Sequence, residues 1–202
     1  SVNQTKQNRE QPTIECPSCK KLFSTQWAKR PEDKAHPKAP VTSERFDVAR
    51  NFCNKLWNAA RFVMINLEGF KPTPLQVAQL PLEDRWILSR LSTTTQSVSQ
   101  AIDSYGYADA ARLVYDFAWD EFCSYYVEMA KPRLQDPAQK AATQQVLAHT
   151  LDQLLRLLQP IIPFVTEAIW QELARFGTQR TLSGEAEEQK WLMKSAWPTA
   201  TL

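Results

Sequence analysis

The stretch ARNFCNKLWNAARF, residues 49–62, carries the strongest structural signal in the chain. At the 100° per residue of an α-helix, its apolar side chains and those that follow fall within one arc of about 100°. They are Ala49, Phe52, Cys53, Leu56, Ala60, Val63 and Leu67. We therefore expect a helix over about residues 43–68 that buries this arc and ends at Gly69, a residue suited to the position after a helix.

The spacing of proline extends this helical pattern along the chain. Proline is absent from residues 41–71, 82–131, 138–159 and 164–197. Because a proline inside a helix costs about 3 kcal/mol, blocks without proline are natural helices. Beyond the first helix we expect four more, from residue 81 to the break at Tyr105-Gly106, and over 107–130, 138–158 and 164–176. Lys131-Pro132 is expected to end the third of the five.

This pattern predicts an all-α fold, an antiparallel bundle of about five helices, with an irregular appendage at the N-terminus. The expected parts are a polar tail or insert (1–41), the helical domain (42–176) and a C-terminal extension (177–202). Residues 1–62 contain 12 Lys and Arg against 6 Asp and Glu, whereas the remainder carries a net charge of −4. This asymmetry favours an anionic partner near the N-terminal end, although a basic tail beside an acidic surface would look the same.

Composition excludes several classes of function. The 202 residues contain 4 glycines, placed so that neither a G-x-G-x-x-G turn nor a G-x-x-x-x-G-K phosphate loop can be written. Only 2 histidines are available for acid–base chemistry. Four scattered cysteines do not form a disulfide scaffold, and no apolar run approaches the ~20 residues that span a bilayer. We expect a cytoplasmic protein without a membrane partner, and not a self-contained nucleotide-dependent enzyme.

The side of the first helix opposite its apolar arc has an unusual composition. Asn51, Asn54, Lys55, Asn58 and Phe62 fall within about 100° of one another, and Arg50 and Arg61 flank them. We call these seven residues the polar stripe. Asparagine is a poor helix former, so three in mid-helix suggest a binding role: amides and cations bond base edges and phosphates, and an outward ring stacks on a base. Alternatively, the amides bond a neighbouring helix or loop, and Phe62 packs under the 70–80 connection.

A second candidate surface lies on the third expected helix, in the stretch WDEFCSYY at residues 119–126. Its aromatic side chains are expected in the core. Asp120 and Glu121 could accept hydrogen bonds from base amino groups or simply face water.

Cys16 and Cys19 form a C-x-x-C pair, which is half of a zinc site. A complete site needs two more ligands. His36, or residues outside this chain, could supply them and form a zinc knuckle; otherwise the two cysteines are free thiols.

The stretch at 49–62 closely resembles the opening helix of the anticodon-binding domain of valyl-tRNA synthetases. The resemblance continues through LPLEDRWILSRL (80–91), YDFAWDEFCSYYVEMAKPRL (115–134) and LLRLLQPIIPFVTEAIWQEL (154–173). These four motifs stand in the family's order over roughly residues 43–175.

The resemblance implies a helical bundle that grips the anticodon stem-loop of tRNA-Val. It implies that Lys55 serves bases or backbone and that Phe62 stacks on an anticodon base. Arg50, Asn51, Asn58 and Arg61 would support them, and Glu121 would belong to a second patch. The alternative is a helical protein-interaction module that does not bind RNA.

The family's adenylate-forming centre, with its HIGH- and KMSKS-type signatures, does not occur in this sequence, and neither do its editing domain and C-terminal coiled coil. The resemblance therefore implies a monomeric fragment that has no cofactor of its own and is inactive alone. Zinc at the cysteine pair is an expectation from the C-x-x-C spacing and not from the resemblance. The parent valine–tRNA ligase would use ATP and Mg²⁺. Residues 1–41 do not match the family core and could be an insert specific to one lineage.

Overall fold

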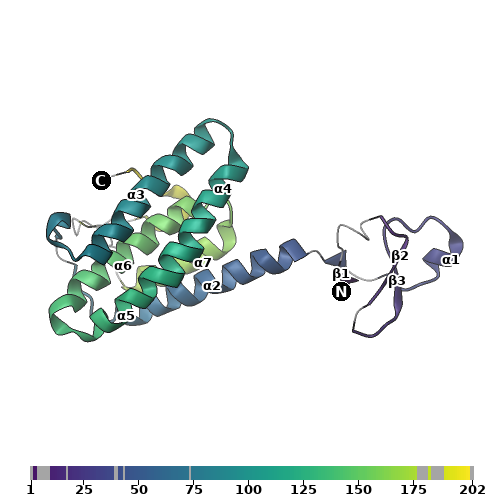
Figure 1. The fold of residues 1–202 in the computed structure, drawn as a ribbon, viewed down its shortest axis with the longest axis horizontal. Helices are drawn as coiled ribbons and strands as arrows, with labels where there is room; N and C mark the ends of the chain where they lie inside the picture. Colours follow the sequence, from purple (N-terminus) through teal and green to yellow (C-terminus); the bar gives the residue numbers. More distant parts are fainter. Residues whose placement is uncertain are drawn as a thin grey trace. The chain divides into compact units, whose positions relative to one another are not determined.

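The computed structural model describes residues 2–3, 10–16, 18–38, 41–42, 44–72, 74–176, 182 and 189–200. The chain forms two compact units, Ser1–Cys53 and Asn54–Leu202. Figure 1 shows the elements of both units. Helix α2 (Glu44–Asn66) begins in the first unit and continues into the second.

The first unit contains the N-terminal appendage, in which short regular elements of two to four residues are separated, among the described residues, by irregular segments. β1 (Val2–Asn3) pairs in parallel with β4 (Val41–Thr42). β2 (Thr13–Glu15) and β3 (Leu22–Ser24) form an antiparallel hairpin in which Glu15 faces Leu22. A single helical turn, α1 (Pro31–Lys34), follows the hairpin.

The second unit is built from helices, which confirms the all-α fold predicted from the sequence. After α2 come the 3₁₀ turn η1 (Val77–Gln79), α3 (Leu82–Asp103), α4 (Tyr107–Asp116), η2 (Phe117–Tyr126), α5 (Val127–Gln135), α6 (Pro137–Leu158) and α7 (Pro163–Leu173). The short η3 (Ala174–Phe176) and η4 (Leu192–Lys194) complete the described elements. Helix α6 packs against α3, α4, α5 and α7 (Figure 1).

The buried side chains follow the helical periodicity of the sequence. On α2, the predicted arc supplies Leu56, Ala60, Val63 and Leu67, each at most 3% exposed, whereas Ala49, also predicted to be buried, is exposed. Leu147, Leu151 and Leu154 of α6 are fully buried. Large aromatic side chains of other helices complete the core. Those rings include Phe117, Phe122, Tyr126 and Trp170. The arc therefore anchors α2 to the bundle and leaves the opposite side of the helix outward.

The third expected helix differs from the prediction. Residues 107–135 form three consecutive segments, and the middle one, η2, is a π-helix. The prediction that Lys131-Pro132 ends this helix is wrong, because Pro132 lies inside α5. A proline in a helix interior costs about 3 kcal/mol. The neighbours Ala130, Arg133 and Leu134 are buried, so their packing keeps α5 helical through Pro132 to Gln135 despite that cost. The next residue, Asp136, instead starts α6 by accepting a 3.0 Å hydrogen bond from the N–H of Ala138.

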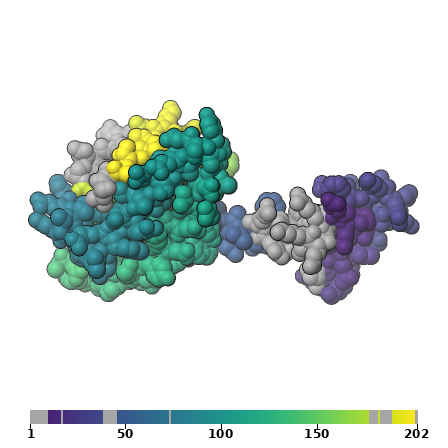
Figure 2. Space-filling view, turned by 45° about the horizontal axis from the view of Figure 1, so that its top comes forward, coloured from purple at the N-terminus to yellow at the C-terminus, as the bar shows by residue number. Residues whose placement is uncertain are grey.

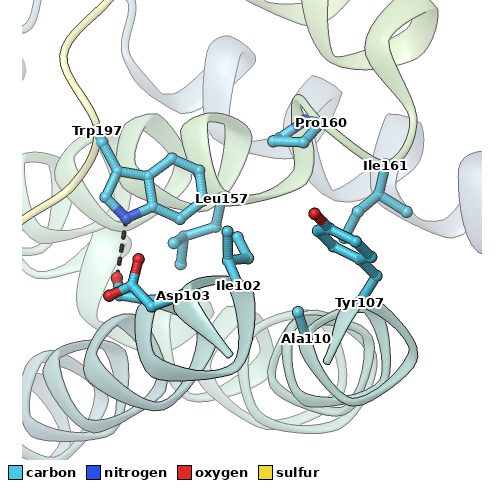
Figure 3. Close-up of a pocket in the computed structure, with 9 residues that line it drawn as sticks. Ile102, Asp103, Tyr107, Ala110, Leu157, Pro160, Ile161 and Trp197 are labelled. Atoms are coloured by element: carbon cyan, nitrogen blue, oxygen red, sulfur yellow. Dashed lines mark hydrogen bonds between the residues drawn. The ribbon is translucent and has the colours of Figure 1, made fainter. Parts of the chain in front are cut away.

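The described part of the C-terminal extension lies on the bundle. Leu192 is only 2% exposed, and the Trp197 indole donates a 2.8 Å hydrogen bond to the Ser99 hydroxyl on α3. Figure 2 shows this segment, in yellow, against the teal surface of α3 and α4. Trp197 also borders an apolar hollow of about 600 Å³ between the ends of α3, α4 and α6, which Figure 3 shows with Tyr107 and Ile161 opposite.

Candidate nucleic-acid interface

Helix α2 and the η2–α5 segment enclose a shallow hollow of about 220 Å³ on the second unit. Three members of the polar stripe line it, and they supply a cation, an amide and an aromatic ring: Lys55, Asn58 and Phe62. The other wall comes from residues far along the chain. The remaining lining residues are Ala59, Cys123, Val127, Glu128 and Lys131.

Lys55 joins the two walls of the hollow. Its ammonium donates a 2.6 Å hydrogen bond to the Ser124 hydroxyl and lies 3.9 Å from the centre of the Trp119 ring. An ammonium has three N–H donors, and Ser124 uses one of them. The contact with the face of Trp119 is a cation–π interaction, which holds the charge without neutralising it. Lys55 is therefore fixed in place as a positive charge at the edge of the hollow.

The π-helix sets the position of Ser124. The Ser124 hydroxyl donates a 2.7 Å hydrogen bond to the backbone carbonyl of Trp119, five residues earlier, where a π-helix places a carbonyl. That bond turns the hydroxyl oxygen toward Lys55, from which it accepts. π-Helical turns are rare and occur often at functional sites.

Cys123 forms a neutral part of the wall. Burial raises the pKa of its thiol to about 12, although the nearby charge of Lys55 acts in the opposite direction. At neutral pH the thiol therefore stays protonated, and it acts in the hollow as a small apolar group.

Phe62 and Lys131 face each other across the hollow. Phe62 is half-buried, and the Lys131 ammonium lies 6.0 Å from the centre of its ring. Glu128, one turn before Lys131, holds that ammonium with hydrogen bonds of 2.6 and 2.7 Å. The ring thus remains partly open to solvent beside a cation, an arrangement suited to stacking a base near a phosphate.

The other predicted site residues lie outside the hollow. Arg50 and Asn51 are exposed on the part of α2 that belongs to the first unit, where Arg50 forms a 2.9 Å ion pair with Asp47. Asn54 and Arg61 are exposed on the same helix within the second unit.

Glu121 of η2 forms a two-pronged ion pair with Arg90 of α3. Both hydrogen bonds measure 2.7 Å, and the Glu121 side chain is only 19% exposed. Its carboxylate therefore joins two helices of the bundle, and it does not line the hollow. A role for Glu121 toward a base amino group stays a prediction.

Sequence reasoning missed Ser124, Glu128 and Lys131. The aromatic stretch around Ser124 was assigned to the core, and Lys131 was assigned to a helix end. The pair Glu128 and Lys131 has the i,i+3 spacing of a helical ion pair, which could have drawn attention to it. The position of Ser124 depends on the π-helix, for which the sequence carries no periodic signal.

Among the residues that the structure describes, no three His, Cys, Asp or Glu side chains come together as a metal site requires. The predicted ligands Cys16 and Cys19 lie together at the turn between β2 and β3. Backbone N–H groups of Cys19 and Ser18, and then the Cys19 thiol, lower the pKa of Cys16 through hydrogen bonds. No described helix is long and apolar enough to cross a membrane.

Comparison with known proteins identifies related sequences. Residues 84–202 match the family described as the anticodon-binding domain of tRNA ligase. The valine–tRNA ligase of Rhodopirellula baltica is 59% identical over 199 residues, which cover 98% of this chain and 19% of that protein. Those of Carboxydothermus hydrogenoformans and Symbiobacterium thermophilum are 46% and 48% identical, over 77% and 65% of this chain and 16% and 15% of those proteins. The chain thus spans less than a fifth of each of these relatives.

Proposed function

This chain belongs to the family of anticodon-binding domains of tRNA ligases, and from this membership we propose that it binds the anticodon stem-loop of tRNA-Val as part of a valine–tRNA ligase. The observation that carries the proposal is the hollow between α2 and η2–α5, where Lys55, Asn58 and Phe62 of the polar stripe meet Lys131. The comparisons give no support to the alternative of a protein-interaction module.

The chemistry of the hollow suits an unpaired base of an RNA loop. Its volume of about 220 Å³ is below the ~300–1,000 Å³ of pockets for drug-sized ligands, so it suits one base and not a larger molecule. Phe62 offers a ring face for stacking, which is worth about 1–3 kcal/mol per base. The Asn58 amide can both donate to and accept from a base edge.

The cations around the hollow suit the RNA backbone. Lys55 of α2 and Lys131 of α5 are positively charged residues at its rim. Arg61 is exposed on α2, the helix that carries Lys55. Arg50 and Asn51 belong to the first unit, and their role in RNA binding stays a prediction. Phosphate contacts release counterions, so the proposed binding weakens as salt rises.

The proposal gives this chain the recognition step and gives the chemistry to the rest of a longer polypeptide. The relatives that carry the ligase activity in their names are five to seven times longer than their match to this chain, which leaves ample sequence for catalytic and editing domains. In that parent protein, ATP and Mg²⁺ would support attachment of valine to tRNA-Val. We accordingly propose that the fragment alone is inactive, monomeric and cytoplasmic.

A binding titration tests the proposal. Fluorescence anisotropy would measure the affinity of the full 202-residue chain for two labelled RNAs. One is the anticodon stem-loop of tRNA-Val, and the other is the same stem with an altered anticodon. We expect weaker binding of the altered loop. We also expect Phe62→Ala to weaken binding of the tRNA-Val loop by about 5- to 150-fold, the equivalent of 1–3 kcal/mol.

Ile65→Ala is the matched control for this titration. Ile65 is an apolar residue of α2, 61% exposed, and it does not line the hollow. Its truncation should leave RNA affinity unchanged. Equal affinity for both loops, together with equal effects of Phe62→Ala and Ile65→Ala, would refute anticodon recognition at this hollow.

A further inference from the structure

The turn between β2 and β3 holds two cysteines in a fixed arrangement. Cys16 directly follows the last paired residue of β2, and the turn closes through two 2.9 Å backbone hydrogen bonds. In one, the N–H of Cys16 donates to the carbonyl of Lys21; in the other, the N–H of Lys20 donates to the carbonyl of Cys16. Lys20 adopts a left-handed conformation with φ of 58°, which is uncommon for a residue with a side chain and turns the chain sharply after Cys19.

The sulfur atom of Cys16 accepts hydrogen bonds from other residues of this turn. The backbone N–H groups of Cys19 and Ser18 donate hydrogen bonds to it, and the Cys19 thiol donates a third. The two sulfur atoms therefore lie on the same side of the turn. A C-x-x-C pair held in one tight turn has the spacing of zinc ligands.

The small size of this part of the chain makes a metal physically useful. Within described residues 10–38, Ile14 is the sole buried hydrophobic residue, and the other buried residues are Ser24 and Thr25. Folded segments of about 40 residues or fewer rarely bury enough apolar surface to be stable, and they are usually held by disulfides or metals. A hairpin with one buried hydrophobic side chain and two thiols in the same turn is typical of small folds that a bound metal stabilises.

We propose that Cys16 and Cys19 are two of the four ligands of a Zn²⁺ ion that stabilises this hairpin. Zinc in structural sites is tetrahedral and accepts thiolates from C-x-x-C pairs at about 2.3 Å. Binding displaces the protons still held by the two thiols, and the metal then links β2 to β3 through both ends of the turn.

His36 does not join the two cysteines. Its backbone carbonyl accepts a 3.1 Å hydrogen bond from Ser24, which pairs with Thr13 at the far end of the hairpin from the turn. The described residues bring no third His, Cys, Asp or Glu to the pair. We assign the remaining two ligands to parts of the longer polypeptide, because the Rhodopirellula baltica relative matches 98% of this chain, including the hairpin, within a far longer protein.

Metal titration of the full 202-residue chain tests this assignment. The chain, reduced with a phosphine, would be titrated with Co²⁺ and then Zn²⁺ while thiolate-to-cobalt absorption is recorded. We expect an absorption band that saturates at one Co²⁺ per chain and disappears when Zn²⁺ displaces the cobalt. In this chain, water would occupy the two coordination positions of the metal that the cysteines leave open. Cys16→Ser and Cys19→Ser should each abolish the band, and the double variant Cys53→Ser/Cys123→Ser should retain it.

Absence of the band from the unaltered chain would overturn the proposal, and so would its loss in the Cys53→Ser/Cys123→Ser control. Alkylation of the unaltered chain gives a second test, which does not depend on whether the cysteine variants fold. Zn²⁺ at ten times its dissociation constant should slow alkylation of Cys16 and Cys19 by about tenfold and leave Cys123 unaffected. Equal alkylation with and without Zn²⁺ would overturn the site, and one metal per two chains in a dimer would overturn the assignment of the outer ligands to the longer polypeptide.

Discussion

The Lys55 ammonium and the Ser124 hydroxyl are 2.6 Å apart, although 69 residues separate them in the chain. Their hydrogen bond joins α2 to η2 at the edge of the hollow proposed to hold an anticodon base. Lys55 therefore fixes the distance between the two walls, and in the proposed function it also carries charge for RNA. These roles can be separated by mutation.

Ser124→Ala should lower the free energy of unfolding by about 1–2 kcal/mol, because the half-buried Lys55 ammonium loses its acceptor. Lys55→Met should also destabilise the protein. The double variant should be more stable than the sum of the two single effects predicts, with a coupling of about 0.5–1.5 kcal/mol. Urea denaturation of all four proteins measures this coupling, and strictly additive effects would show that the hydrogen bond contributes nothing.

Lys131 should contribute to RNA binding mainly through its charge. Lys131→Gln is expected to weaken binding of the stem-loop and to reduce the slope of log affinity against log salt by about 0.7, the value for one contact with single-stranded phosphate. Anisotropy titrations between about 50 and 200 mM salt give the slope. Lys140→Gln is the control, because Lys140 is exposed on α6 and does not line the hollow. Identical slopes for the two variants would remove Lys131 from the interface.

The sequence predicted α2 and one wall of the hollow for the same physical reason. A long helix with one apolar arc must bury that arc, so the opposite side must face outward. Leu56, Ala60 and Val63 are buried as the periodicity predicts, and Lys55, Asn58 and Phe62 line the hollow. The predicted bounds of α2, 43–68, differ from the observed Glu44–Asn66 by one residue at the start and two at the end.

The other wall of the interface could not be predicted, because it depends on how the chain winds through η2. A π-helix has more residues per turn than an α-helix, so each later side chain is rotated away from the position that a 3.6-residue period gives it. The residues of FAWDEFCSYY, Phe117–Tyr126, are ordinary helical and core types and carry no mark of this winding. Lys131 lines the hollow from within α5, which continues through Pro132 to Gln135, where the proline rule predicted a helix end.

The raised pKa of Cys123 predicts loss of stability at alkaline pH. The folded thiol titrates near pH 12 because it is buried, whereas the unfolded thiol titrates near 9. The folded state therefore retains a proton that the unfolded state releases, so this contribution is complete below pH 9 and falls as pH rises toward 12. Between pH 9.5 and 11, the unaltered protein should lose up to about 1.4 kcal/mol per pH unit more than Cys123→Ala. Urea denaturation at stepped pH measures both curves, and parallel curves over this range would contradict the burial of the thiol.

The bundle also contains a buried charge network that should dominate its response to mutation. Arg133 of α5 donates hydrogen bonds of 2.6 and 2.5 Å to the two carboxylate oxygens of Asp84 on α3, which is fully buried. Tyr126 donates a further 2.6 Å hydrogen bond to the same carboxylate. Burial, followed by the charge of Asp84, raises the pKa of Tyr126 well above its usual value, so its hydroxyl remains a donor across the accessible pH range.

Arg133→Met should lower the free energy of unfolding by about 3–5 kcal/mol, because it leaves the Asp84 carboxylate buried without its cation. The double variant Asp84→Leu/Arg133→Met should recover much of that loss, since apolar replacement of both partners removes the unpaired charge. The exposed pair Arg112 and Asp109 provides the control: both side chains are more than 65% exposed, so Arg112→Met should change stability by less than about 0.5 kcal/mol. Urea denaturation at pH 7 measures all three. If Arg133→Met behaved like Arg112→Met, the Asp84–Arg133 pair would not be the buried link between α3 and α5 described above.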